Sequence, residues 1–279
     1  MEIVNTFEYQ NMKTEVISGY INGVAFVSVN SPLDIIKVRM QESNTNMLTN
    51  LKDIFFNEGF KSFWKGSLFP LMTVGINSSI LFTLNKFNVS WISRWNEKLN
   101  KGVKKYFLAG SLSGLGYGLV ITPVENIKIK MQIQKKNQMY KNSFDCCCKL
   151  IKKRGFGSLF QGLGITLLIE VIGCGVYLGI YFSIKEMFNV SNHHSIMMIG
   201  GLTGCLSFLS ICCLDPIKTK IMSREFSESK INYWEEIKQV INKKSKMGIV
   251  PALTGSFISN SFAFLFYELS IKHLNKYLA

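Results

Sequence analysis

Six charged side chains of this sequence repeat one pattern, an acid followed three residues later by a lysine. The members are Asp34 and Lys37, Glu125 and Lys128, and Asp215 and Lys218. The three acids stand 91 and then 90 residues apart. All six follow apolar runs, where an isolated charge is costly and tends to pair with a charge of opposite sign. This spacing therefore predicts ion pairing inside an apolar body, with acids and bases held at matched depth.

The stretches that carry these charges resemble one another along their whole length. They read PLDIIKVRMQ at 32–41, PVENIKIKMQ at 123–132 and CLDPIKTKIM at 213–222. Pro32 and Pro123 each remove a backbone hydrogen bond, which predicts a kinked helix. In the third stretch Cys213 takes the place of the proline and Pro216 follows it. We expect the kink of the third stretch one turn later.

Pairs of glycines share the same interval. They stand 13 and 9 residues before each stretch and are Gly19 and Gly23, Gly110 and Gly114, and Gly200 and Gly204. Small residues four apart let helices approach closely in lipid. Two independent features with one period predict three structural repeats, at approximately 14–98, 103–188 and 194–276. We expect the repeats to form one domain over residues 1–279.

Apolar and charged residues are segregated along the chain. Hydrophobic residues make up 47% of it, yet the formal net charge is +14. Most of the 32 Lys and Arg fall in residues 37–65, 128–161 and 218–246, between apolar runs. This distribution fits basic loops on one side of a membrane, near anionic headgroups. A soluble nucleic-acid binder usually presents one basic face, so we expect no nucleic-acid partner.

The sequence offers little for catalysis. Its seven cysteines and three histidines lack the spacing of metal ligands. No nucleophile–base pair or phosphate-binding loop is recognisable. We expect no metal, no cofactor and no enzymatic activity.

Each repeat is predicted to form a long kinked span, a short surface helix and a second span. The last span begins at Gly248 or at Gly255, and the distance from Asp215 favours Gly248. A span needs roughly 20 residues. The fold class is therefore an all-α membrane protein with six transmembrane helices. The elements expected by residue range are 15–41, 49–57, 67–92, 143–153, 163–188 and 233–242.

The repeated stretches resemble the signature PX[DE]XX[KR]X[KR] of the mitochondrial carrier family. It is met by Pro32, Asp34, Lys37 and Arg39 and by Pro123, Glu125, Lys128 and Lys130, while the third copy lacks its proline. EGFKSFWKG at 58–66 is similar to the family's glycine-rich continuation. The resemblance covers nearly the whole chain. It implies a six-helix barrel with pseudo-threefold symmetry, multi-pass in the mitochondrial inner membrane, around a solute path open alternately to either side.

The resemblance also implies roles for the charges. Asp34 would pair with Lys128, Glu125 with Lys218 and Asp215 with Lys37, and the pairs would close the matrix end as a gate. Gln41 and Gln132 occupy the positions from which family members brace this network. Met222 stands at the third such position and cannot brace comparably.

At the opposite end the family carries [FY][DE]XX[KR]. The matching positions here are Asn85, Lys86 and Val89, Tyr181, Phe182 and Lys185, and Tyr267, Glu268 and Ile271. No acid–base pair can be completed between neighbouring repeats. We expect a weak cytoplasmic gate.

Substrate contacts in the family lie about two helical turns past the glycine that begins each even-numbered helix. Carried over, they are Thr73 with Val74, Ile169 with Glu170, and Gly255 with Ser256, and Asn77 is a further candidate that could equally join helices. The family's usual arginine is absent, which disfavours anionic substrates. Glu170 is the one charge of its apolar run and predicts an amine-bearing or cationic solute, or proton coupling. A headgroup-level acid without a substrate role stays open.

The partners expected are a small-molecule solute and membrane lipids. Lys65 and Gly66 begin a helix near the basic membrane face, where the family binds cardiolipin. We expect a monomer. A carrier-like adaptor that no longer transports is the alternative function, favoured by the missing arginines and opposed by the complete set of paired charges.

Overall fold

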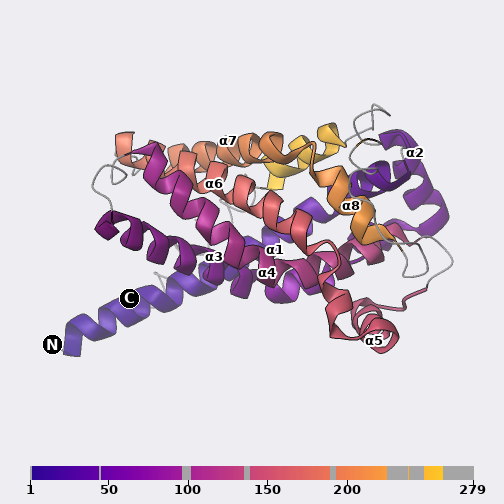
Figure 1. Ribbon diagram of the computed structural model, residues 1–279, viewed down its shortest axis with the longest axis horizontal. Coiled ribbons are helices and arrows are strands. Elements are labelled where there is room, and N and C mark those ends of the chain that lie inside the picture. The colour runs from indigo at the N-terminus through magenta and orange to yellow at the C-terminus, as the bar shows by residue number, and fades with distance from the viewer. Residues whose placement is uncertain are drawn as a thin grey trace.

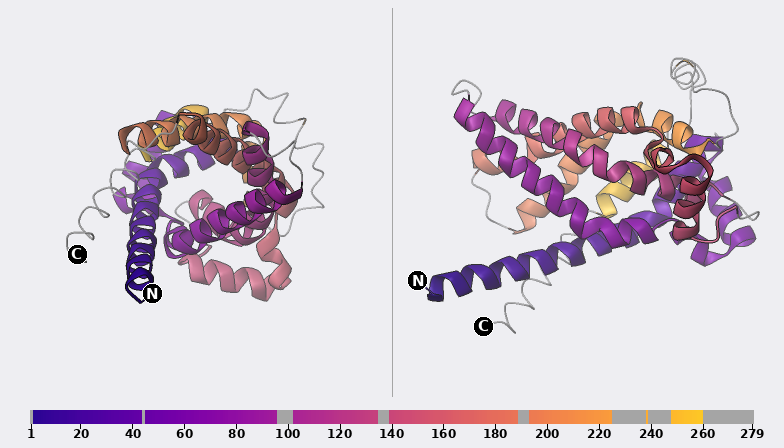
Figure 2. Two further views of the ribbon diagram at one scale, coloured as in Figure 1. Left: turned by 90° about the vertical axis from the view of Figure 1, so that its left-hand side faces the viewer. Right: turned by 60° about the horizontal axis from the view of Figure 1, so that its bottom comes forward.

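The computed structural model describes residues 2–43, 45–95, 102–134, 139–188, 193–224, 238 and 248–259. Over these residues the regular structure is helical. The long helices run roughly side by side, and α1 projects beyond the body at its N-terminal end (Figure 1). Viewed along the body, the helices are arranged around a common axis (Figure 2). The predicted all-α fold is therefore confirmed.

The first repeat contains two long helices joined by short ones. Their bounds are α1 Glu2–Ser43, α2 Met47–Lys52, η1 Asp53–Glu58, η2 Phe60–Trp64 and α3 Leu68–Trp95. The helix expected at 15–41 begins earlier, at Glu2, and runs through Pro32. The short helix expected at 49–57 consists of an α-helical part followed by a turn of π-helix.

The second repeat follows the same plan. It comprises α4 Val103–Ile133, α5 Ser143–Arg154, η4 Phe156–Phe160 and α6 Leu163–Phe188. The α5 helix begins after Asn142, whose side chain accepts a hydrogen bond from the Asp145 amide at 2.8 Å. An Asn at this position satisfies one of the free N–H groups of a helix start. Lys152, Lys153 and Arg154 close α5 where its dipole favours cations.

The third repeat has a broken first helix. It contains α7 His193–Ile211 and α8 Asp215–Ser223, which meet at an angle of 68°. The break covers residues 212–214, in the turn before the displaced proline, where a kink caused by Pro216 is expected. Pro216 lies in the first turn of α8. Because its ring excludes a helical carbonyl four residues earlier, the backbone breaks before the proline.

The third repeat continues with a helix at Ile249–Ser259. The short helix expected at 233–242 lies outside the described residues except for Lys238. The helix at 249–259 is preceded by Gly248, whose φ is +62°. Gly66 and Gly162 have φ of +82° and +81° just before α3 and α6. These three glycines hold equivalent places, which favours Gly248 over Gly255 as the start of the last span.

Small residues mark the helix contacts, and the helices close into a ring. Gly75 of α3 faces Tyr20 of α1, and Gly116 of α4 faces Leu84 of α3. On α4, Gly110 lies against the backbone of Cys174 in α6. A β-carbon at Gly110 would lie 2.6 Å from the Cys174 carbonyl oxygen, so only glycine permits this approach.

The remaining contacts complete the circuit. Ser207 of α7 donates to the Gly173 carbonyl of α6 at 2.9 Å. Gly201 of α7 lies near Phe257 in the helix at 249–259, and Gly255 of that helix packs against α1 at Leu33. Six helices thus form a closed ring within the described part of the chain, in the order α1, α3, α4, α6, α7–α8 and 249–259.

Two described helices, α4 and α6, are long and apolar enough to cross a membrane. Met198–Ile211 together with Asp215–Ser223 forms a third, bent span. The α1 and α3 helices have the length but carry more polar side chains, including Asn30 in α1 and Asn85 and Lys86 in α3. Six spans remain a prediction.

Candidate functional site

The helices α1, α4 and α8 carry the three repeated stretches, and each of them contacts the other two. Lys37 lies 2.8 Å from Asp215, and Lys128 lies 2.7 Å from Asp34. Lys218 forms an ion pair with Glu125. Each pair joins one repeat to a different repeat, in the pairing that the resemblance implied. We call these six residues the charge ring.

The two glutamines brace two of the three pairs. Gln132 donates to Asp34 at 3.0 Å, and Gln41 donates to Asp215 at 2.6 Å. The side-chain carbonyl of Gln41 also accepts a hydrogen bond from the Thr219 hydroxyl at 2.6 Å. Both glutamine side chains are buried. Met222, at the corresponding place in the third stretch, has no N–H to offer the Glu125–Lys218 pair.

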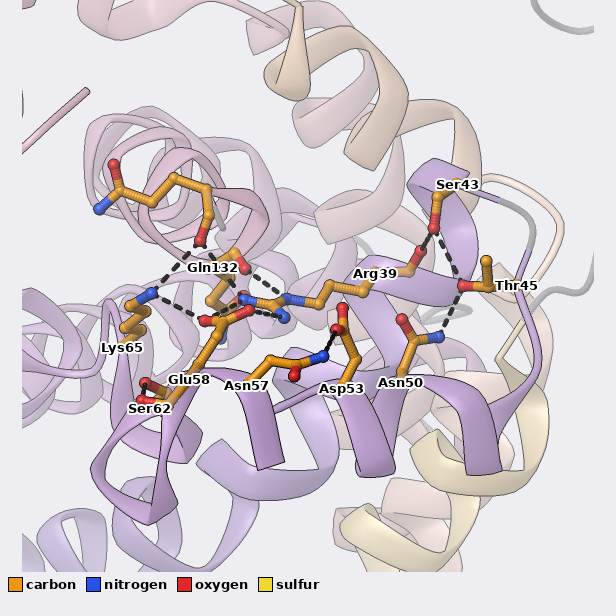
Figure 3. Close-up of polar contacts among 11 residues, drawn as sticks. Arg39, Ser43, Thr45, Asn50, Asp53, Asn57, Glu58, Ser62, Lys65 and Gln132 are labelled. Carbon is orange, nitrogen blue, oxygen red and sulfur yellow. Dashed lines mark hydrogen bonds and ion pairs between the residues drawn. The ribbon is translucent and has the colours of Figure 1, made fainter. Parts of the chain in front are cut away.

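A second cluster of charged side chains joins Arg39, Glu58 and Lys65 (Figure 3). Arg39 makes two hydrogen bonds to Glu58, at 2.6 and 3.0 Å, and Lys65 lies 2.8 Å from the same carboxylate. Arg39 also donates to the backbone carbonyl of Gln132 at 2.9 Å. The cluster ties α1 to the segment before α3 and to the end of α4. Sequence reasoning missed it, although Arg39 and Glu58 each belonged to a recognised motif.

Burial favours a neutral Glu58, but the hydrogen bonds and charges of Arg39 and Lys65 outweigh it. The pKa of Glu58 is therefore held below its usual value of 4.5. The Glu58 and Arg39 side chains are only 4% and 2% exposed. A bidentate, buried pair of this kind has the geometry of a strong charge-assisted interaction.

In the second repeat a related cation holds the end of α8. Lys130 donates to the Met222 carbonyl at 2.8 Å and to the Arg224 carbonyl at 2.9 Å. Gln161 donates to the Ile221 carbonyl at 2.6 Å. The last carbonyls of a helix lack intrahelical partners and attract cations. Arg39 and Lys130 therefore each fix the helix end of another repeat.

The glycines that precede α3, α6 and the helix at 249–259 lie against this region. A β-carbon at Gly66 would lie 2.8 Å from the Lys128 carbonyl oxygen, and one at Gly162 would lie 3.1 Å from Met222. At Gly248 it would lie 3.1 Å from Lys37. Each repeat thus contacts a ring residue or a brace position of its neighbour.

The positions expected to form the cytoplasmic gate on α3 and α6 lie at the opposite end of the barrel. Asn85 is buried and Lys86 is exposed. Phe182 stacks on Tyr106, with ring centroids 5.6 Å apart, and meets Tyr181 edge to face. Residues 267, 268 and 271 and the side chain of residue 185 lie outside the described part of the chain.

The candidate substrate residues have different surroundings. Asn77 donates to the Thr73 hydroxyl at 3.1 Å, and that hydroxyl donates to the Phe69 carbonyl at 2.9 Å. The Cys174 thiol donates to Glu170 at 3.6 Å, one turn along α6. The structure therefore gives Thr73, Asn77 and Glu170 polar partners within their own helices.

Three further candidates lie in helix contacts. Val74 packs against Gly23 of α1, and Gly255 packs against Asn30 of the same helix. Ile169 is 2% exposed. These three residues contribute to packing.

A closed circuit of helices with internal ion pairs at one end defines a class of protein, the helical membrane carriers. A sequence profile of the mitochondrial carrier protein family matches residues 9–94 and 100–192, and the chain belongs to this family. It is accordingly a multi-pass solute carrier of the mitochondrial inner membrane.

The chain is similar over most of its length to several characterised carriers. It is 29% identical over 282 residues to the glutamate/glycine mitochondrial carrier ymc1 of Schizosaccharomyces pombe, covering 92% of this chain and 93% of the relative. Identity is 25% to the mitochondrial glycine transporter YMC1 of Saccharomyces cerevisiae, over 93% of this chain and 91% of the relative. It is also 25% to the mitochondrial arginine transporter BAC2 of Arabidopsis thaliana, with the same coverage of 93% and 91%.

Proposed function

We propose that this carrier moves an amine-bearing or cationic small metabolite across the inner membrane by alternating access, with the charge ring as its matrix gate. The observation that carries the proposal is the connectivity of the ring. Each ion pair links two different repeats, so separating the repeats at that end must break all three pairs. Desolvation offsets much of the attraction in a buried ion pair, so such pairs can hold a gate and still open.

Glu170 is the residue to which we assign recognition of the amine. It is a carboxylate within the apolar part of α6, and an acid at such depth is a functional candidate by default. Its hydrogen-bond partner in the structure is a thiol, Cys174, which is a weak donor. A substrate ammonium would be a stronger partner. The relatives are named for glycine, glutamate/glycine and arginine, which all carry an amine.

Thr73 and Asn77 would supply neutral polar contacts from α3. Their hydrogen bonds leave the Asn77 carbonyl and part of the Thr73 hydroxyl to serve a substrate. Val74, Ile169 and Gly255 would shape the site through their packing rather than bind the solute. Proton coupling through Glu170 is the second mechanism that this site would support.

The transported solute would leave chemically unchanged, and we propose that the protein is not an enzyme. Lipid phosphates, cardiolipin among them, would bind where Lys65 and the backbone at Gly66 begin α3. The circuit of six helices closes within one chain, which supports function as a monomer.

A carrier-like adaptor without transport is the alternative. The opposite end of the barrel favours it, because Asn85 and Lys86 stand where the signature of that end calls for an aromatic residue and an acid. A protein that never opens would need no gate that can break, and the charge ring therefore favours transport.

Uptake into proteoliposomes tests the proposal. The panel would contain labelled glycine, glutamate, arginine, carnitine, a nucleotide and a dicarboxylate. We expect saturable uptake of an amine-bearing solute, and a loss of at least tenfold in Glu170→Gln. The matched control is Glu186→Gln, the same change at an exposed position of the same helix, which should transport normally.

Three outcomes would revise the proposal. Uptake confined to the nucleotide and the dicarboxylate would retain the carrier and remove Glu170 from recognition. Uptake by Glu170→Gln that equals uptake by the control Glu186→Gln would likewise remove Glu170 from recognition. Folded protein that moves nothing on the panel would favour the adaptor.

A further inference from the structure

Lys37 has a second partner that the charge ring does not explain. Its ammonium nitrogen lies 5.0 Å from the centroid of the Phe208 ring, over the ring face. Phe208 is 8% exposed, and its ring is shielded from solvent. A cation within about 6 Å of an aromatic centroid is attracted by the negative face of the ring. Lys37 is thus held by the Asp215 carboxylate and by the Phe208 ring together.

This arrangement is found in one repeat of the three by sequence. Phe208 precedes Asp215 by seven residues. The residues seven positions before Asp34 and Glu125 are Val27 and Gly118, which offer no ring. The contact is therefore a property of this chain's third repeat and not of the repeated pattern.

The contact also spans the break in the third repeat. Phe208 lies on α7, before residues 212–214, and Asp215 begins α8 after them. The two helices diverge by 68°, whereas α1 and α4 continue through their prolines. One ammonium group from α1 therefore contacts both arms of the broken helix and fixes their relative position.

We propose that Phe208 is a positioning residue of the matrix gate. It holds Lys37 over its ring and makes the Lys37–Asp215 pair the most firmly held link of the charge ring. Gln41 reinforces the same link by donating a hydrogen bond to Asp215, and Thr219 in turn donates to the Gln41 side chain. The Glu125–Lys218 pair, next to Met222, would separate first as the gate opens. The inference rests on the proposed role of the ring as a gate.

Progressive fluorination of Phe208 tests the contact. Phenylalanine would be replaced by its 4-fluoro, 3,5-difluoro and 3,4,5-trifluoro analogues. These progressively reduce the negative electrostatic potential of the ring face with little change in side-chain volume. We expect the thermal midpoint of the purified full-length carrier to fall at each step, by about 2–4 °C in total. In the Lys37→Gln background the series should be flat.

The outcomes separate a π contact from simple packing. Fluorine makes the ring more apolar, so packing alone predicts a flat or rising midpoint in the native background. Either of those results would overturn the proposal, even if Lys37→Gln does not fold. The same slope in both backgrounds would also overturn it.

The midpoint measurement needs no substrate, so it is independent of the transport assay. If the thermal midpoint falls with each fluorination but the carrier transports no solute, the contact between Lys37 and Phe208 stands and the role of the charge ring as a gate is rejected. If the carrier transports solute but fluorination leaves the midpoint unchanged, the gate stands and the positioning role of Phe208 is rejected.

Discussion

The Gln41 side chain donates a 2.6 Å hydrogen bond to the Asp215 carboxylate, linking the first helix to the last helix of the charge ring. The two residues are separated by 174 positions in sequence. Gln132 makes the equivalent bond to Asp34 at 3.0 Å. The Gln41 amide uses its carbonyl as well, through Thr219. The braces of the ring are therefore unequal, and their removal should have unequal effects.

We predict that Gln41→Ala destabilises the carrier more than Gln132→Ala does. A hydrogen bond to a charged group contributes about 1.5–3 kcal/mol, and Gln41→Ala also leaves Thr219 without its acceptor. The thermal midpoints of the two purified variants measure the difference. Equal midpoints would show that the bond from Thr219 contributes nothing.

Met222→Gln is the complementary change. It would place an amide beside the pair that lacks one, with little change in side-chain volume. We expect a higher thermal midpoint and slower transport, because the gate becomes harder to open. A lower midpoint would mean that the buried amide finds no partner next to Glu125 or Lys218.

The Asp34–Lys128 pair should behave as a unit. Lys128→Ala removes the cation that pairs with Asp34 and leaves Gln132 as its hydrogen-bond donor, and breaking one partner of a buried pair costs about 3–5 kcal/mol. Exchanging the two residues, with Asp34→Lys and Lys128→Asp together, should recover part of the uptake that either reversal abolishes. Uptake in proteoliposomes and thermal midpoints report the two effects.

The surface supplies a matched control for this pair. Asp145 and Lys149 lie 2.8 Å apart on α5, with side chains 26% and 41% exposed. An exposed pair contributes only about 0–1 kcal/mol, so Asp145→Ala should leave uptake nearly unchanged. A comparable loss at both sites would indicate that the carrier responds to any lost charge and not to the ring.

Part of the site followed from spacing in the sequence, because acids and bases at matching depth predicted that the six charges would pair. The partner of each acid, such as Lys128 for Asp34, came from the resemblance to the carrier family and not from the spacing. The Arg39–Glu58 contact could not be predicted, because the second repeat has Arg154 where the first has Glu58. A contact without a periodic counterpart leaves no repeat to detect.

Other features depend on geometry that spacing does not encode. The break at 212–214 precedes Pro216, since the proline excludes the turn before it. The Phe208 contact requires the rotation of α7 about its own axis, and the surroundings of Val74 require that of α3. The rotation of a helix about its axis is set by its packing against neighbouring helices. Residue spacing in a single sequence does not reveal those packing contacts.

The lowered pKa of Glu58 predicts how the thermal stability of the carrier depends on pH. The Glu58 pKa is lower in the folded protein than the usual 4.5, so its ionised form adds stability above that value, which is lost as the pH falls through the folded pKa. The native protein should therefore have the higher midpoint than Glu58→Gln at pH 7, by a difference that stays constant down to about pH 5. Below about pH 4.5 the two midpoints should converge. Thermal scans in detergent at stepped pH measure the difference, and groups common to both proteins cancel. A difference that persists unchanged into acid would assign the effect to shape instead of charge.

The last prediction separates backbone strain from close approach, using two glycines of the first repeat. Gly59 and Gly66 both have positive φ, at +89° and +82°. A β-carbon at Gly59 would meet nothing within 4 Å, whereas one at Gly66 would lie 2.8 Å from the Lys128 carbonyl oxygen. Gly59→Ala should therefore cost only the strain of a side chain at positive φ with extended ψ, about 1–3 kcal/mol.

Gly66→Ala should cost clearly more, because α4 must move away at the residue that pairs with Asp34. Such a shift would lengthen a gate ion pair, so we expect uptake to fall together with the thermal midpoint. Gly59→Ala should lower the midpoint slightly and leave uptake near the native level. If the two variants lost the same stability and the same uptake, the close contact between Gly66 and α4 would have no part in holding the gate.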